Sequence, residues 1–180
     1  MVTDEVETFT RQGILLKSGR ELPADIIVTA TGLNLLAFGG IRLDVDGTIV
    51  EAGRCLTYKG LMPSDVPNFA ACAGYANASW TLRAELSAEY VGRPLRHMEH
   101  HAYAQCVPRC DQETVRARPL LPLMSGYVRR GADMIPKQGP KAPWVMHQNY
   151  LLDLLSLRLA KVDDGVLVSA KAGTHASPGA

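Results

Sequence analysis

The run Ala24-Asp25-Ile26-Ile27-Val28-Thr29-Ala30-Thr31-Gly32 decides the fold class of this chain. An acidic residue leads into an unbroken apolar run, which ends in small and hydroxyl residues before a glycine. This pattern is typical of a strand that is buried on both faces, as in a parallel sheet. Gly32 predicts a tight turn in which the backbone closely approaches a neighbour or a ligand. Since ligands in open α/β sheets lie outside the carboxyl ends of such strands, the run predicts part of a nucleotide-handling sheet.

The composition is that of a globular chain with a hydrophobic core. The chain has 180 residues, of which 47% are hydrophobic and 21% are charged, and both fractions are ordinary for one folded domain or slightly more. The formal net charge of +1 gives no strong electrostatic case for binding nucleic acid or an anionic membrane. No apolar run approaches the ~20 residues that a transmembrane helix needs.

The start of the chain and its cysteines predict a cytoplasmic location. Residues 1–5 lack a basic region followed by an apolar segment, so they do not resemble a signal peptide. The four cysteines are irregularly spaced, and Cys72 lies in an apolar run that predicts a buried thiol. A reduced, cytoplasmic chain follows from this pattern.

Several short elements are expected on either side of the opening run. Residues 6–10 and 13–16 read as two strands followed by a turn at Ser18-Gly19, and residues 33–40 as a loop or a short turn of helix. Residues 41–45 and 48–50 form a hairpin around Asp46-Gly47.

A second strand buried on both faces is expected over residues 69–74, followed by a capped helix from Trp80. Gly92 is a natural stop for that helix, whose buried stripe would be Leu82, Leu86 and Tyr90. The helical pattern resumes after Pro94 and ends near Tyr103.

The carboxyl-terminal third differs in composition from the rest of the chain. Six prolines between residues 106 and 147 favour an extended arm. A short helix over 150–159, a turn at 163–165 and a strand over 166–168 follow, and residues 169–180 read as a disordered tail.

The unit formed by the strand 69–74 and its helix is the first candidate site. A helix amino end presents unpaired N–H groups and a partial positive charge, which suit a phosphate or the carbonyl end of a flavin ring. The alternative is that Asn77 and Ser79 do no more than cap the helix.

A histidine and cysteine cluster is the second candidate, as a small metal-binding module; its members are His97, His100, His101, Cys106 and Cys110. Zinc favours such ligands, but their spacing matches no paired-ligand motif and Pro108 interrupts the cysteine pair. The sequence also contains no G-x-G-x-x-G, no G-x-x-x-x-G-K-[ST] and no G-x-S-x-G. The strand over 25–31 therefore lacks the glycine turn that grips a pyrophosphate.

The opening run, together with Thr8-Phe9-Thr10 and Gly13-Ile14, resembles the middle of class B flavoprotein monooxygenases. This group holds the flavin-containing and Baeyer–Villiger monooxygenases, and the likeness is greatest to the ethionamide-activating branch. More specific matching blocks follow at Tyr58–Met62, Val66–Phe69, Gly74–Leu82 and Pro136–Tyr150, so the resemblance extends to about Val168.

The resemblance implies an α/β fold: an incomplete, three-layer Rossmann-like domain for FAD and NAD(P), with a proline-rich carboxyl-terminal extension. It implies an FAD- and NADPH-dependent oxidation by O2 of a ketone, or of a sulfur or nitrogen centre. Ala30-Thr31-Gly32 would be the return linker between the NADPH and FAD domains, and the helix opening at Ser79 would point at the flavin ring. The cofactor-binding residues implied in this chain are Thr31, Gly32, Gly74, Asn77, Ser79, Trp80 and Thr81.

The chain lacks four features that the family carries before this region: both glycine motifs, the F-x-G-x-x-x-H-x-x-x-W-P fingerprint and the catalytic arginine. No catalytic residue is therefore assigned, and no metal ligand. The expected organisation is the end of an NADPH domain with its return linker (1–32), part of an FAD domain (33–95), an extension (96–168) and the tail.

We thus expect the carboxyl-terminal portion of such an enzyme, arising from truncation, a split gene or a misplaced start. Alone it would be inactive and would expose apolar strand edges. The alternative is a non-catalytic remnant that docks on a flavoprotein, either a missing amino-terminal half or a homologue.

Overall fold

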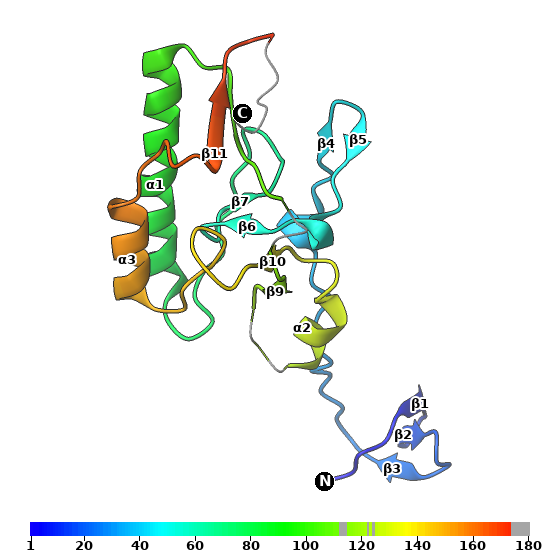
Figure 1. Cartoon of the computed structure of the whole chain (residues 1–180). Coiled ribbons are helices and arrows are strands. Elements are labelled where there is room, and N and C mark those ends of the chain that lie inside the picture. Colours follow the sequence, from blue (N-terminus) through cyan, green and yellow to red (C-terminus); the bar gives the residue numbers. More distant parts are fainter. Residues whose placement is uncertain (112–114, 122, 124, 174–180) are drawn as a thin grey trace. The chain divides into compact units, whose positions relative to one another are not determined.

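The computed structural model describes residues 1–111, 115–121, 123 and 125–173 of the chain. The chain divides into two compact units, Met1–Leu33 and Asn34–Ala180, and each is described by itself. Both contain small antiparallel sheets, and the second also contains helices, so the predicted mixture of α and β structure is confirmed (Figure 1).

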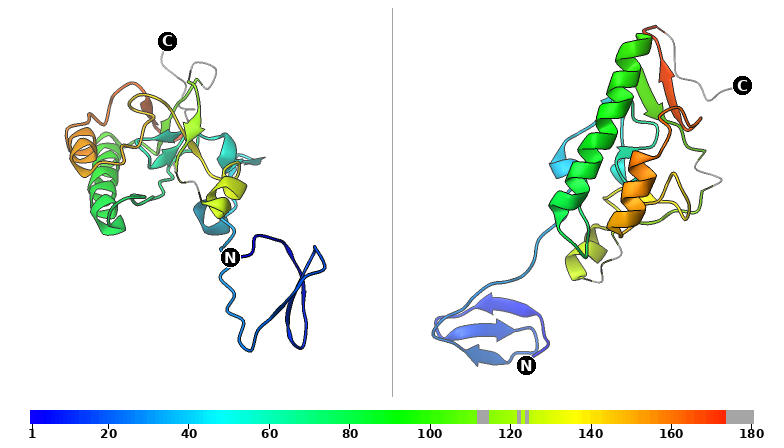
Figure 2. Two further views of the ribbon diagram at one scale, coloured as in Figure 1. Left: turned by 90° about the horizontal axis from the view of Figure 1, so that it is seen from below. Right: turned by 90° about the vertical axis from the view of Figure 1, so that its left-hand side faces the viewer.

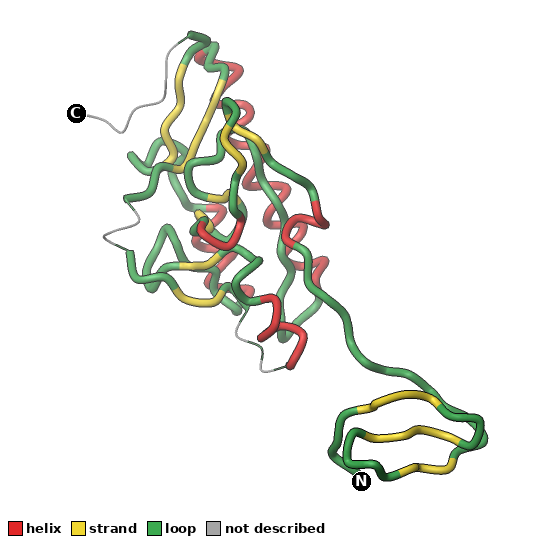
Figure 3. The backbone as a smooth tube through the Cα atoms, turned by 90° about the vertical axis from the view of Figure 1, so that its right-hand side faces the viewer, coloured by secondary structure: helices red, strands yellow, loops and turns green. Residues whose placement is uncertain are grey.

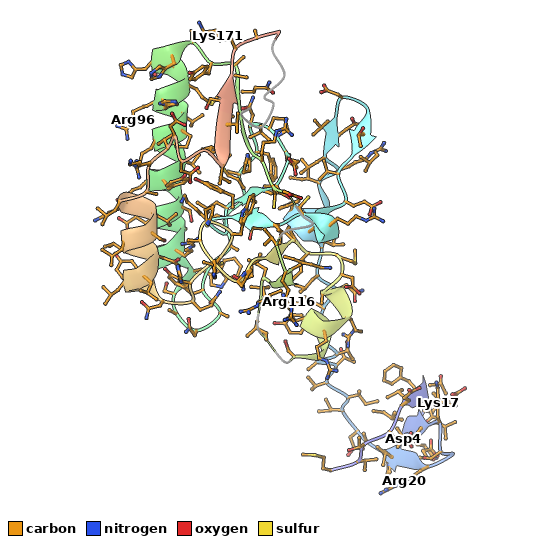
Figure 4. The ribbon with its side chains drawn as sticks, in the orientation of Figure 1. Asp4, Lys17, Arg20, Arg96, Arg116 and Lys171 are labelled. Carbon is orange, nitrogen blue, oxygen red and sulfur yellow. The ribbon has the colours of Figure 1, made fainter. Side chains whose placement is uncertain are left out.

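The first unit is a three-stranded antiparallel sheet in the order β1-β2-β3, formed by Val6–Phe9, Gly13–Leu16 and Glu21–Pro23. The first two strands were predicted, and β3 is an addition. Charged side chains, including Asp4, Lys17 and Arg20, project from this sheet (Figure 4). Lys17 forms an ion pair with Glu5, and a hydrogen bond with Ser18 lowers the pKa of Asp4.

The predicted strand over residues 25–31 is wrong for this structure. These residues belong to no strand, and Ile26 and Val28 are 83% and 85% exposed. The physical reason is that an apolar run becomes a buried strand only where neighbouring strands and a covering layer accept it. Among the described residues of this unit, β3 pairs only with β2, so residues 25–31 find no neighbouring strand and no covering layer there.

The second unit is built on a long helix, α1, which covers Trp80–His101. The helix α3, Tyr150–Arg158, packs along it, as Figure 2 shows for α1 in green and α3 in orange. The strands β8 (Gln105–Pro108) and β11 (Leu167–Ala170) pair antiparallel beside α1. The core between these elements contains Tyr58, Leu61, Leu86, Tyr90, Trp144 and Leu157.

Short elements and loops make up the rest of this unit (Figure 3). The predicted hairpin is β4 (Asp44–Val45) with β5 (Thr48–Ile49), and η1 (Ala37–Gly40) is the expected short turn of helix. The remaining elements are η2 (Ala52–Arg54), β6 (Thr57–Tyr58), β7 (Met62–Pro63), β9 (Arg118–Pro119), α2 (Gly126–Gly131) and β10 (Lys137–Gln138).

Two predictions near α1 need correction. Residues 69–74 form no assigned strand, and Cys72 is exposed rather than buried. The helix does not stop at Gly92 but continues through Pro94 to His101. Burial of Tyr90 and Pro94 outweighs the local helix-breaking tendency of Gly92 and Pro94. Of the predicted stripe, Leu86 and Tyr90 are buried while Leu82 is exposed; Arg83 and Ser87 take the remaining buried positions.

The carboxyl-terminal predictions agree more closely with the structure. The helix predicted over 150–159 is α3, and the strand predicted over 166–168 is β11, which runs two residues into the expected tail. Residues 174–180 of that tail lie outside the described residues. The predicted arm over 106–147 is interrupted by β8, β9, α2 and β10. None of the helices in the described part combines the length and apolar character that crossing a bilayer requires.

Candidate functional site

The amino end of α1 is the centre of the candidate site. Ser79 occupies the N-cap position with extended backbone angles, but its side chain caps no backbone N–H. Its hydroxyl instead lies 2.7 Å from the Thr81 hydroxyl. Residues 76–82 are exposed. The N–H groups of the first helical turn, and the positive end of the helix dipole, therefore face outward and are open to an electron-rich group.

Gly74 and Trp80 fit against each other at this end of the helix. Gly74 is buried, and a Cβ atom built on it would lie 2.3 Å from two atoms of the Trp80 side chain. Only glycine therefore admits the indole in this position. The close approach of the backbone at Gly74 is made to Trp80, while 65% of Trp80 remains exposed.

Asn77 ties the loop before α1 to the segment before α3 and does not cap α1. Its side-chain amide donates to the Gln148 carbonyl over 3.1 Å, and the Gln148 side-chain oxygen accepts from Ala76 N–H over 2.9 Å. Next in sequence, Asn149 caps α3 by accepting from Leu152 N–H. The two helix starts are thus held side by side through Asn77 and Gln148.

A buried ion pair lies one turn into α1. Arg83 and Asp153 on α3 are 0% and 1% exposed, and Arg83 Nη1 lies 3.0 Å from Asp153 Oδ2. Arg83 Nη2 also donates to the Lys59 carbonyl over 2.6 Å. Burial raises the pKa of Asp153, and the Arg83 charge opposes that rise. Beside the pair, burial raises the pKa of Tyr75 to about 12.

Sequence reasoning missed this pair. Arg83 follows the predicted apolar position Leu82 and was not among the candidate residues. A signal was available, because helical spacing places Arg83 on the same face as Leu86, Tyr90 and Pro94.

A second buried polar group surrounds Tyr58. The Tyr58 hydroxyl donates to Asp164 Oδ2 over 2.7 Å and lies 3.1 Å from the Tyr90 hydroxyl. Lys59 Nζ lies 3.8 Å from the same Asp164 oxygen and 4.7 Å from the centre of the Tyr58 ring. Burial raises the pKa of Tyr58 and lowers that of Lys59. The block Tyr58–Met62, which carries part of the family resemblance, therefore contributes to the hydrophobic core.

Five of the predicted cofactor-binding residues lie together at the start of α1: Gly74, Asn77, Ser79, Trp80 and Thr81. Thr31 and Gly32 belong to the first unit, where both are exposed and Gly32 has a φ of 84°. Their part in cofactor binding stays a prediction.

The histidine and cysteine cluster does not form a metal centre among the described residues, which contain no group of three or more potential ligands. His97 and His101 lie against Tyr103, with the His101 and Tyr103 rings stacked at 5.4 Å. Cys106 is instead buried in the core with Tyr58 and Leu86.

An apolar groove of about 530 Å³ adjoins Trp80. Its walls come from residues 35–41, from the extended segment 69–73 and from residues 120–121 and 135–136. The Phe38 and Phe69 rings meet edge to face across one wall at 5.1 Å. The site thus combines an outward-facing helix end with a large apolar surface.

Comparison with known proteins gives close matches. The chain is 48% identical to the FAD-containing monooxygenase EthA of Mycobacterium tuberculosis over 171 residues, which is 95% of this chain and 35% of EthA. It is 46% identical over 166 residues to AlmA of Acinetobacter baylyi, described as a probable FAD-binding monooxygenase, covering 92% of this chain and 33% of AlmA. EthA of Mycolicibacterium smegmatis is 47% identical over 164 residues, 91% of this chain and 33% of that protein.

These matches confirm the resemblance to FAD-containing monooxygenases, of which the chain matches a carboxyl-terminal portion. The chain spans about a third of the length of these relatives. No family model matches it, and no solved structure matches it.

Proposed function

We propose that this chain forms the carboxyl-terminal part of an FAD- and NADPH-dependent monooxygenase that acts on ketones, as in Baeyer–Villiger oxidation, or on sulfur or nitrogen centres. The observation that carries this proposal is the 48% identity to EthA over 95% of the chain. That match includes the segment at which α1 begins, where we place the flavin ring.

The residues of this chain fit one end of the cofactor. Exposed N–H groups and the dipole of the 22-residue helix α1 stabilise negative charge placed before Ser79. Trp80 offers an exposed aromatic face beside it. When bound, FAD supplies the redox chemistry that transfers electrons from NADPH to O2. The role of α1 is to favour the anionic form of the reduced ring.

The other end of FAD needs groups that this sequence does not carry. A pyrophosphate is ordinarily cradled by a glycine-rich turn, and no G-x-G-x-x-G is present. We therefore assign the pyrophosphate of FAD, and the NADPH site, to polypeptide outside this chain. The first unit would then be the edge of the NADPH domain, with Thr31 and Gly32 in the return linker.

The four cysteines are free in the structure, which fits a reducing compartment. On that ground we propose a cytoplasmic location. The substrate and O2 would meet the flavin only in the completed enzyme, so the isolated chain would be inactive.

The test uses the two tryptophans as reporters. Trp80 is exposed at the proposed flavin end and Trp144 is buried in the core. The purified chain with FAD should oxidise no NADPH. Co-expressed with the part of M. tuberculosis EthA that lies outside the match, it should bind FAD, and FAD should quench Trp80 emission.

The variant Trp80→Phe should lose that quenching while the Trp144 emission stays. Equal quenching in Trp80→Phe would contradict the placement of the flavin at α1. NADPH oxidation by the isolated chain would overturn its proposed inactivity.

A further inference from the structure

We propose that the apolar groove beside Trp80 is the docking surface for a separate amino-terminal polypeptide of the same enzyme class, so that the two pieces associate without a covalent link. This inference rests on the proposed function. To the proposed function it adds the surface through which the two polypeptides contact each other and the way in which they contact. It also predicts that they assemble without a covalent link.

Large apolar side chains are exposed along the groove. Leu36, Ile41 and Trp80 are 59%, 62% and 65% exposed, and they come from two separate segments of the chain. Contiguous apolar surface of this kind marks an interaction site when it occurs on a folded unit. All of these residues belong to the second unit, so the groove exists within one compact body.

The segment 69–73 forms one wall of the groove, and its backbone can also contact a partner. Its side chains alternate between half-buried and exposed, with Ala70 and Cys72 facing outward. Among the described residues it makes one backbone-to-backbone hydrogen bond, from Ala71 N–H to the Leu61 carbonyl over 2.8 Å. Extended backbone with open hydrogen-bonding groups accepts an added strand. We therefore expect the partner to contribute a strand beside residues 69–73.

The chemistry of the lining favours a polypeptide over a small ligand. No charged side chain lines the groove within the described residues. The hydroxyl of Thr57, one of its few polar groups, already bonds to the Lys137 carbonyl. A small-molecule site usually has several convergent polar groups that fix the orientation of its ligand. This groove instead resembles an exposed half of a domain core.

The length of the relatives identifies the occupant. EthA of M. tuberculosis carries most of its length outside the matched part, which is 35% of that protein. A polypeptide equivalent to that remainder is the occupant that we propose. A second copy of this chain is the competing occupant that the experiment must detect.

The experiment co-expresses the full chain, carrying an affinity tag, with the part of M. tuberculosis EthA outside the match as a separate polypeptide. We expect a one-to-one complex by light scattering. In that complex Cys72, which lines the groove and is exposed in the free chain, should react with iodoacetamide at least about tenfold more slowly, since a covered thiol reacts only on opening.

Matched variants locate the contact. Leu36→Glu and Ile41→Glu should lower the recovered partner at least about tenfold, because each buries a charge without a counter-ion. Leu95→Glu is the control: Leu95 is 60% exposed on α1, almost equal to Leu36, and does not line the groove. Circular dichroism and the buried Trp144 emission verify that every variant is folded.

Several results would overturn the proposed docking surface. It fails if no partner is recovered with the wild-type chain, if Leu95→Glu matches Leu36→Glu, or if the isolated chain is a dimer with protected Cys72. It also fails if an apolar dye binds the groove and remains bound in the complex. A complex that assembles through the groove but binds no FAD would contradict the proposed function and would still support the docking surface.

Discussion

Arg83 of α1 and Asp153 of α3 form an ion pair with an N–O distance of 3.0 Å, almost fully shielded from water. Because Arg83 also donates to the Lys59 carbonyl, the pair joins both helices to the turn after β6. Ala76 and Asn77, at the candidate site, bond to the segment that leads into α3. The pair therefore helps to hold the amino end of α1 in place against α3.

Removing one partner of this pair should be costly. Arg83→Met or Asp153→Leu should each lower the free energy of unfolding by about 3–5 kcal/mol, because the charged partner stays buried without compensation. The double variant Arg83→Met/Asp153→Leu should lose less than the sum of the two. Urea unfolding followed by circular dichroism measures all three. Additive losses would contradict the coupling.

Gly74→Ala should displace the indole of Trp80. The added methyl would lie 2.3 Å from Trp80 side-chain atoms, so the ring must move. Overpacking of this kind costs about 1–3 kcal/mol of stability. Iodide quenching of Trp80 emission should also increase. Gly92→Ala is the control, because its Cβ would meet nothing within 4 Å and α1 runs through it. That change should stabilise by about 0.5–1 kcal/mol.

Arg93 caps the carboxyl end of α3 from the neighbouring helix. Its Nη1 donates to the carbonyls of Leu157 and Arg158 over 2.7 and 3.1 Å, and its Nη2 donates to the Ala160 carbonyl. Arg93→Met should cost about 1.5–3 kcal/mol, the range for hydrogen bonds to a charged group. Arg93→Lys should restore part of this, since an ammonium lacks the planar fork. Equal stability of the wild-type chain and Arg93→Lys would show that the fork contributes nothing.

The sequence predicted the elements that local signals define. Cap and turn residues marked the start of α1 and the β4–β5 hairpin, and apolar content marked the α3 helix; all three are present. Gly92 and Pro94 misled the prediction of the α1 end, since tertiary packing of Pro94 outweighs its local effect.

Residues 25–31 and 69–74 were wrongly predicted as buried strands, for a physical reason that also explains Cys72. An apolar run records the surroundings that a segment requires, but hydrogen-bonded neighbours must be present to form the strand. In the described residues both segments lack them. The candidate site was predicted through Gly74, Ser79 and Trp80. Helical spacing could have placed Arg83 on the buried face of α1, but it could not identify Asp153, which is distant in sequence, as its partner.

The pH dependence of stability should include a contribution from Glu89 on α1. Arg158 of α3 donates from Nε and Nη2 to its two carboxylate oxygens, each over 2.9 Å. These bonds hold the pKa of Glu89 below its ordinary value of 4.5. Because the folded carboxyl group has the lower pKa, the stabilisation is fully present above the unfolded value. It is lost as the pH falls through the folded pKa.

The stability difference between the wild-type chain and Glu89→Gln should therefore be constant from about pH 7 to about pH 5.5 and shrink below about pH 4.5. Urea midpoints across this range measure it. The difference should also shrink in about 1 M NaCl, because both side chains are exposed and salt screens them. Glu85→Gln, one turn earlier on α1, is the control. A pH profile for Glu89→Gln equal to that of Glu85→Gln would show that the contact between Glu89 and Arg158 does not hold α3 against α1.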